Sequence, residues 1–246
     1  MRLNTSEIEL SKQDIKRGLR LPSEMSQSLA EDIGIMVGDG HIGEYLSSDR
    51  KEYQIMVSGD AKTDKDYILN YVKKLKKDLF NLDIPHYFVG TNKSELRLKI
   101  CSKGMVQFYK QIIGLPMNRK SAIRIPSLFW NKQEYLGHFL RGLFDTDFSI
   151  NFKKVEKYPV IQAKMCSREL IVDCQKALSV LGIKANTYLD IKETHCVTGN
   201  DYVTNYLCVN GRKNLQTWME RIGSSNSKHL EKIKWARRDS NSRPIA

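Results

Sequence analysis

The chain has 246 residues, of which 41% are hydrophobic, and this length suits one large domain or two small ones. The formal net charge of +12 and the pI near 9.4 favour a polyanionic partner, although a basic surface kept for solubility has the same composition. No apolar run reaches the roughly 18 residues of a membrane span, and the N-terminus is not typical of a signal peptide. The five cysteines form no CxxC pair, and their odd number argues against a disulfide framework. We therefore expect a reduced protein without zinc, in the cytoplasm or an organellar matrix and not secreted.

The stretch SLAEDIGIMVGDGHI, residues 28–42, predicts an apolar helix that starts at a capping box on Ser28. Gly34 and Gly38 lie four residues apart and share one face of this helix. Asp39 stands at its end, where a carboxylate meets the negative end of the helix dipole. A bound cation would offset this unfavourable placement.

A strand, a helix, a hairpin and another helix follow this first stretch. Residues 53–58 alternate as a strand does, and residues 64–80 carry an apolar stripe at helical spacing. The segments 84–90 and 95–100 suggest a hairpin. Residues 103–113 are predicted to form a helix that ends before a glycine and a proline.

A second apolar helix is predicted in NKQEYLGHFLRGLFDTDFSI, residues 131–150, starting near Asn131. Its Gly142, Thr146 and Asp147 fall on the two glycines and the aspartate of the first stretch. Small residues at this spacing let two helix backbones approach closely. If the two helices pack through these faces, their terminal aspartates lie side by side.

The order of elements then recurs, with an offset of about 108 residues, so we predict an internal repeat whose unit is αββαββα. The expected elements of the second unit are strands at 148–155 and 160–166, a helix at 168–182, strands at 186–192 and 202–209, and a helix at 211–222. A last helix is expected near residues 227–238. The predicted divisions are an N-terminal arm at 1–27, a first repeat at 28–115, a linker at 116–130, a second repeat at 131–236 and a C-terminal tail at 237–246.

The two nine-residue cores DIGIMVGDG, residues 32–40, and LRGLFDTDF, residues 140–148, resemble the motif of the LAGLIDADG homing endonucleases. The sequence departs from that motif at Phe148, where the family usually has glycine. The resemblance implies an α+β fold of two pseudo-symmetric repeats packed through the motif helices, with antiparallel sheets forming a saddle for DNA. It implies a monomeric enzyme that makes a Mg²⁺-dependent double-strand break in a long asymmetric site. Because no splice-junction residues are recognisable, we expect a free-standing, intron-encoded protein rather than an intein.

The carboxylates of the two motifs are the candidates for metal binding. By this interpretation Asp39 and Asp147 hold Mg²⁺, for which Ca²⁺ or Mn²⁺ can substitute, and the carbonyls of Gly38 and Thr146 add ligands. The alternative is a pair of exposed carboxylates without a role. Asp145 has an apolar counterpart in the first motif, so we predict a capping or packing role for it.

The family tends to place a lysine near each metal-binding aspartate. Lys120 and Lys228 are the candidates, since each follows a repeated Ile-Gly pair at a similar distance, and Lys99 competes with them. Such a lysine would stabilise charge at the scissile phosphate. The alternative for each lysine is a solvated contact to phosphate.

Polar residues at period two on the strands are the candidates for DNA binding, because a basic β-ribbon can enter the major groove and read base edges. Tyr188, Asp190 and Lys192 are predicted to share one face of their strand. An ordinary solvated sheet face would give the same pattern. The candidate residues are Gln54, Arg97, Lys99, Ser149, Asn151, Lys153, Gln162, Lys164, Tyr188 and Lys192.

Two rival functions share the same scaffold. The first is an intron maturase whose partner is intron RNA, and cleavage of an intronless DNA target would separate it from the endonuclease. The second is a DNA-binding regulator that has lost catalysis. Both motif aspartates are present here, so the regulator ranks below the maturase.

Overall fold

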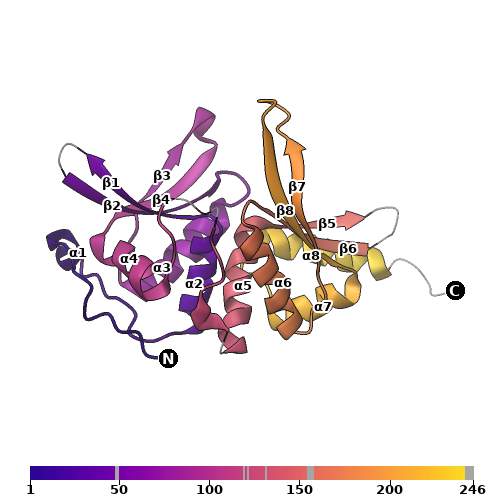
Figure 1. Cartoon of the computed structure of the whole chain (residues 1–246), viewed down its shortest axis with the longest axis horizontal. Helices are drawn as coiled ribbons and strands as arrows, with labels where there is room; N and C mark the ends of the chain where they lie inside the picture. The colour runs from indigo at the N-terminus through magenta and orange to yellow at the C-terminus, as the bar shows by residue number, and fades with distance from the viewer. Residues whose placement is uncertain (48–49, 119, 121, 131, 154–157, 242–246) are drawn as a thin grey trace.

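The computed structural model describes residues 1–47, 50–118, 120, 122–130, 132–153 and 158–241. Two groups of elements meet at a central helix pair, to which the first group contributes α2 and the second contributes α5 (Figure 1). The first group consists of α1 (Lys12–Lys16), α2 (Gln27–Val37), β1 (Gly40–Ser47), β2 (Arg50–Asp60), the π-helix η1 (Tyr67–Val72), α3 (Lys73–Phe80), β3 (His86–Val89), the 3₁₀-helix η2 (Thr91–Lys93), β4 (Glu95–Cys101), α4 (Lys103–Gln107) and the π-helix η3 (Phe108–Ile113). The second group consists of the 3₁₀-helix η4 (Ser127–Phe129), α5 (Gln133–Asp147), β5 (Phe148–Lys153), β6 (Tyr158–Met165), α6 (Arg168–Val180), β7 (Asn186–Thr194), β8 (Asp201–Asn210), α7 (Arg212–Arg221) and α8 (Ser227–Asn241).

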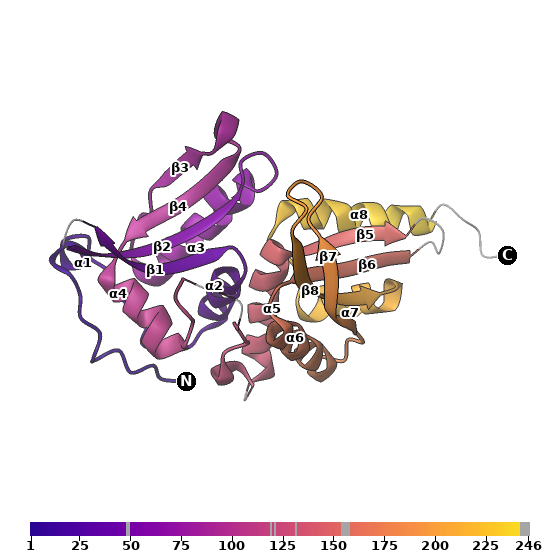
Figure 2. The ribbon, with the colours of Figure 1, turned by 45° about the horizontal axis from the view of Figure 1, so that its top comes forward.

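The sheets of the two groups have the same topology. Both are four-stranded and antiparallel, with strand orders β1-β2-β4-β3 and β5-β6-β8-β7. Along β2, Ile55 and Val57 are buried while Met56 and Ser58, which alternate with them, are partly exposed, as in a sheet covered on one face. Helices cover the buried faces, and no helix of the described residues covers the other faces (Figure 2). The expected α+β fold of two αββαββα units is therefore confirmed.

The central helices α2 and α5 approach each other through small residues. A methyl group at Gly34 would lie 2.1 Å from the Phe139 carbonyl oxygen, and one at Gly142 would lie 2.0 Å from the Glu31 carbonyl oxygen. Neither helix could keep this position with a larger residue at its glycine. The prediction that the small residues permit a close backbone contact is confirmed.

The start of the first motif helix was placed wrongly. The side chain of Ser26, not Ser28, accepts a hydrogen bond from the backbone N–H of Leu29, and the helix begins at Gln27. Several serines in this segment have capping chemistry, so the local pattern did not select one. Asn131, the predicted start of the second motif helix, lies outside the described residues, and α5 begins after Lys132.

Other boundaries differ less. Helix α8 continues to Asn241, beyond the expected start of a tail at residue 237. Strand β5 covers residues 148–153 of the predicted strand at 148–155. Residues 154 and 155 lie outside the described residues, as do 119 and 121 of the linker and 242–246 of the tail. No helix in the described ranges is both long and apolar enough to cross a membrane.

A β-bulge corrects the predicted face of Lys192. Asp190 adopts a left-handed conformation with φ of 57°, and the pairing of β7 with β8 shifts there. Tyr188 and Glu193 stand opposite two tyrosines of β8 that are four residues apart, so these two side chains share one face. The bulge adds one residue between them, and Lys192 consequently turns to the other face. The expected common face of Tyr188, Asp190 and Lys192 was therefore wrong.

Candidate active site at the ends of the motif helices

The two motif aspartates meet where α2 and α5 end. Gly38 caps α2 and precedes Asp39, whereas Asp147 is the last residue of α5. A methyl group at Gly38 would lie 2.0 Å from the Thr146 hydroxyl oxygen and 3.4 Å from the carboxyl carbon of Asp147. The glycine therefore permits the two helix ends to touch, and the expected convergence of these residues is present.

Both carboxyl groups are costly to ionise in this position. Burial raises the pKa of Asp39 to about 7, and the charges of Asp147 and Asp64 raise it further, against the opposing charges of Lys120 and Lys228. Burial also raises the pKa of Asp147 to about 6, again opposed by Lys120. A bound cation would relieve this cost, because it would neutralise carboxylates that burial and mutual repulsion destabilise.

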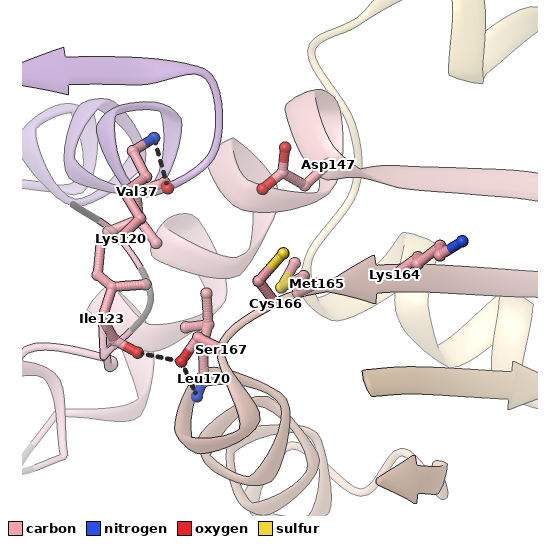
Figure 3. Close-up of a pocket in the computed structure, with 9 residues that line it drawn as sticks. All are labelled: Val37, Lys120, Ile123, Asp147, Lys164, Met165, Cys166, Ser167 and Leu170. Carbon is pink, nitrogen blue, oxygen red and sulfur yellow. Dashed lines mark hydrogen bonds between the residues drawn. The ribbon is translucent and has the colours of Figure 1, made fainter. Parts of the chain in front are cut away.

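Lys120 lies beside the end of α2 rather than in bulk solvent. Its ammonium group donates hydrogen bonds to the carbonyl oxygen of Val37, at 3.0 Å, and to that of Gly38 (Figure 3). Burial lowers the pKa of Lys120, while Asp147 and Asp39 act in the opposite direction. The structure thus brings one predicted lysine to both aspartates. The Gly38 carbonyl, a predicted metal ligand, already accepts from this lysine.

The other predicted lysines are held differently. Lys228 donates to Asp64 at 2.5 Å, across the boundary between the two repeats. At the end of α2, backbone carbonyls accept hydrogen bonds from Lys120. At the end of α5, the backbone carbonyl of Asp145 instead accepts one from the Asn226 amide, at 3.0 Å. Lys99, the competing candidate, stands opposite Met56 in the first sheet. Asp64 was not predicted, because it belongs to no motif and lies 164 residues from its partner Lys228 in the chain.

Asp145 is buried and holds the segment that precedes α8. Its carboxylate accepts hydrogen bonds from the Ser224 hydroxyl and, at 2.7 Å, from the backbone N–H of Ser225. Burial raises the pKa of Asp145 to about 7, and these hydrogen bonds oppose the shift. This arrangement agrees with the packing role that the sequence predicted for it.

A cavity of about 620 Å³ opens beside Asp147 (Figure 3). Cys166 and Met165 lie near the Asp147 carboxylate, while the Lys164 side chain points away from it. The Ser167 hydroxyl donates to the Ile123 carbonyl oxygen at 2.7 Å and thereby closes one wall. No sequence signal marked the 165–167 turn, because its residues reach the site only through the sheet. The cavity is lined by Val37, Lys120, Ile123, Asp147, Lys164, Met165, Cys166, Ser167 and Leu170.

The predicted DNA-binding residues of the first sheet lie together on its helix-free face. Arg97 stands opposite Ser58 in β2, and Lys99 stands opposite Met56. Gln54 belongs to the same alternating set of β2. Arg97 also donates to both carboxylate oxygens of Glu95, at 2.7 and 2.8 Å. Its fork is therefore already oriented by a neighbour on the same strand.

In the second sheet the predicted residues also share the helix-free face, apart from Lys192. Ser149 stands opposite Gln162, and the Asn151 amide donates to the Ser149 hydroxyl at 3.1 Å. Lys153 lies over the ring of Tyr158, with 5.5 Å between its nitrogen and the ring centroid. Tyr188, on β7, is 53% exposed.

Lys164 belongs to a polar cluster that the sequence did not reveal. Its ammonium group donates to the Glu193 carboxylate at 2.6 Å and to the Tyr202 hydroxyl at 3.0 Å. Tyr206 donates to the other carboxylate oxygen of Glu193. The bulge in β7 is what brings Glu193 to this face, so an unbroken strand period could not have predicted the cluster.

The donor set suits a hard cation such as Mg²⁺. Asp39 and Asp147 offer carboxylate oxygens, and the backbone at Gly38 and Thr146 offers carbonyl oxygens near them. Across the described part of the chain, no three His, Cys, Asp or Glu residues are grouped so that they could hold a metal ion. Mg²⁺ ordinarily uses one or two carboxylates and fills its remaining positions with water and phosphate, so two aspartates fit it.

Comparison with solved structures identifies the fold. The complex of I-DmoI with DNA and Ca matches with a TM-score of 0.58 and 15% identity, covering 85% of this chain and 97% of that one. The LAGLIDADG homing endonuclease I-GzeII, in complex with its DNA target, matches with a TM-score of 0.56 and 10% identity, covering 91% of this chain and 94% of that one. The fold, with two sheets about a packed helix pair, is that of the LAGLIDADG homing endonucleases.

A family model also matches part of the sequence. Residues 134–223 match the family model described as a LAGLIDADG-like domain. The second repeat therefore resembles this family in sequence, and the chain as a whole has the fold of the LAGLIDADG homing endonucleases.

Curated relatives match over most of this chain but over little of their own length. The replication factor C small subunit of Methanocaldococcus jannaschii is 27% identical over 217 residues, which are 86% of this chain and 10% of that protein. The probable translation initiation factor IF-2 of Thermococcus kodakarensis is 26% identical over 221 residues, 86% of this chain and 16% of that protein. The chain thus spans between a tenth and a sixth of the length of these two relatives.

Proposed function

We propose that this chain is a site-specific DNA endonuclease that makes a metal-dependent double-strand break in a long, asymmetric site. The observation that carries the proposal is the pair of buried aspartates, Asp39 and Asp147, at the touching ends of the motif helices. Two carboxylates that resist ionisation in the metal-free protein are well suited to bind a divalent cation.

Each residue of the site has a distinct proposed task. Asp39 and Asp147 hold Mg²⁺, with the carbonyls at Gly38 and Thr146 as further oxygen donors. When bound, the metal supplies charge neutralisation at the phosphate and lowers the pKa of a bound water. Lys120 presents a fixed positive charge next to both carboxylates, where negative charge develops as the phosphodiester bond breaks. Lys228 is the corresponding group of the second repeat.

We assign DNA binding to the helix-free faces of the two sheets. These faces carry Arg97 and Lys99 in the first sheet and Lys153 and Lys164 in the second, and the whole chain has a net charge of +12. Phosphate contacts set the affinity and the register, whereas polar side chains on the strands contact base edges. I-DmoI, I-GzeII and I-LtrWI, which share the fold, were crystallised with DNA.

One chain supplies both halves of the proposed site, so we propose a monomer that binds an asymmetric sequence one to one. The divisions at residues 28–115 and 131–236 remain our proposal for its two repeats. The match to minor parts of proteins with unrelated names agrees with a module that is carried within different host proteins. The expectation of a free-standing protein therefore stays a prediction.

The test is selection of cleaved sequences from a random duplex library with Mg²⁺, with EDTA as the control. We expect recovery of one long, non-palindromic consensus, cut on both strands. Specific binding of a DNA sequence without cleavage under any divalent metal would instead favour the regulator. Tight binding of a structured intron RNA, with no selected DNA, would favour the maturase.

A further inference from the structure

The two candidate lysines are equivalent in the repeat but not in the structure. Lys120 and Lys228 are 108 residues apart, as are the two motif aspartates, so each lysine has the same sequence relation to its own motif. Within the described residues, Lys120 donates its hydrogen bonds to neutral backbone carbonyls, whereas Lys228 donates to a carboxylate, that of Asp64. Equal positions in the repeat therefore carry unequal electrostatic environments.

Asp64 lies close to the candidate site through the first sheet. The backbone N–H of Ser58 donates to the Asp39 carbonyl oxygen at 3.2 Å. A methyl group on the next residue, Gly59, would lie 3.2 Å from the Asp64 side chain. The Asp64 and Lys228 side chains are only 16% and 28% exposed, so solvent screens their ion pair less than it would a surface pair. Lys228 is thus held beside the site by a third acidic residue.

The second repeat has no carboxylate in the corresponding place. The carbonyl oxygen of Asp64 accepts from the Ile68 N–H at the start of its helix, and the carbonyl oxygen of Ser167 accepts from the Ile171 N–H at the start of α6 in the same way. Ser167 carries an uncharged hydroxyl, which donates to the Ile123 carbonyl oxygen at 2.7 Å. The cavity that Lys120 lines contains Ser167 and Leu170 from this region, and the carboxylate that lines it is that of Asp147, itself a candidate metal ligand. The extra carboxylate is therefore a feature of one half of the site only.

We propose that Asp64 is a positioning residue that holds Lys228 back from the reaction centre, so that the two DNA strands are cut at unequal rates. To reach a phosphate, Lys228 must give up a charge-assisted hydrogen bond, whereas Lys120 gives up only bonds to neutral carbonyls. The strand that depends on Lys228 is cut second. This inference rests on the proposed endonuclease function and adds the order of strand cleavage to it.

The experiment follows both strands of the selected target, each end-labelled, in single-turnover reactions with Mg²⁺. In the wild type we expect one strand to be cut about tenfold faster than the other. Lys228→Met identifies the slow strand, because it lowers the rate of that strand further. Asp64→Asn frees Lys228 and raises the rate of the same strand about fivefold, leaving the fast strand within twofold. Asp64→Glu keeps the carboxylate and restores the wild-type ratio.

Matched controls separate this role from a structural one. Asp66→Asn changes a neighbouring carboxylate that accepts from Ser227 and Asn70, and it leaves the strand ratio unchanged. When Asp64→Asn is added to the Lys228→Met variant, the cutting rates of both strands stay as they are in Lys228→Met alone. Thermal unfolding tests the ion pair between Asp64 and Lys228 without an activity measurement. Asp64→Asn and Lys228→Met should each lower the melting temperature by at least as much as the double variant does.

The possible failures differ in what they overturn. A wild type that cuts DNA, with a strand ratio that Asp64→Asn leaves unchanged or with both strands altered equally, overturns this inference alone. A wild type that cuts neither strand of any selected sequence overturns the proposed function and this inference together.

Discussion

The two repeats have the same order of elements and the same sheet topology, yet their interiors differ. In the first repeat, the α2 residue Asp32 is fully buried and accepts a hydrogen bond from Lys76 at 2.6 Å and another from Tyr109. The corresponding position of α5 is Leu140, which is buried in an apolar core. At the helix ends, Lys228 is paired with a carboxylate and Lys120 is not. Topology is thus shared, while charge is distributed unequally.

This comparison separates two kinds of constraint. Apolar periodicity and small residues at the helix interface determine the fold, and both repeats satisfy them in the same way. Individual charged contacts determine the chemistry, and these contacts differ between the two repeats. A functional difference between the halves of the site is therefore expected even where the backbone is nearly symmetric.

The helix pair offers the strongest test of the shared part of this comparison. Gly34→Ala and Gly142→Ala each place a methyl group within about 2 Å of a backbone oxygen of the partner helix. We expect both to lower the free energy of unfolding by about 3 kcal/mol or more, and by similar amounts, because the contact is reciprocal. Chemical denaturation measures this loss. Gly43→Ala is the control, since its methyl group meets only the movable Tyr45 ring. A large difference between the first two variants would contradict a symmetric interface.

The salt dependence of DNA binding tests how the two sheets share the charge. A binding surface of this size should make at least about six phosphate contacts, which gives a slope near −5 for log K against log salt, at roughly 0.9 per contact. Lys99→Ala should reduce the slope by about one unit. Lys164→Ala should reduce it less, because Lys164 is already paired with Glu193. A wild-type slope shallower than about −3 is incompatible with an extended binding surface.

The two lysines test the unequal part of the comparison directly. We expect Lys120→Met to lower the cutting rate of the faster strand about 100-fold, because it removes the charge next to both aspartates. Lys228→Met should lower the cutting rate of the slower strand about tenfold, since the charge of Lys228 is partly offset by Asp64. Single-turnover cleavage with saturating enzyme measures both rates. Equal losses for the two variants would mean that the ion pair with Asp64 does not distinguish them.

In the metal-free protein, Asp39 and Asp147 should lower the stability as the pH rises. Asp39 has a folded pKa of about 7 and Asp147 of about 6, both above the ordinary value of 3.8. Between the ordinary and the folded pKa values, these two carboxyl groups hold protons in the folded state that they have lost in the unfolded state. Their contribution to stability is therefore greatest near pH 4 and falls as the pH rises to 7. Asp39→Asn should therefore stabilise the protein above pH 7 by about 1 to 3 kcal/mol, and by less at pH 5. Melting temperatures in EDTA test this, with Glu220→Gln as the control.

The sequence predicted what depends on local periodicity. The 108-residue repeat, the helix pair and the convergence of Asp39 with Asp147 all follow from apolar spacing and small residues. The bulge at Asp190 was missed because one inserted residue reverses every later side chain without an unusual sequence signal. Ion pairs such as Lys228 with Asp64 were missed because their partners are distant in the chain. Such contacts depend on how the repeats dock, which no single segment encodes.

The most direct test of the central claim uses Asp39→Asn and Asp147→Asn on the selected target. Each change keeps the size of the side chain but removes the charge that would hold the metal, so each variant should lose double-strand cleavage in Mg²⁺. Binding, measured by gel shift in Ca²⁺, should stay within a few fold of the wild type, because the sheets supply the phosphate contacts. This outcome would identify the aspartates as the cleavage centre. Near-normal double-strand cleavage by either variant would contradict that assignment, and loss of binding together with cleavage would make the two aspartates structural.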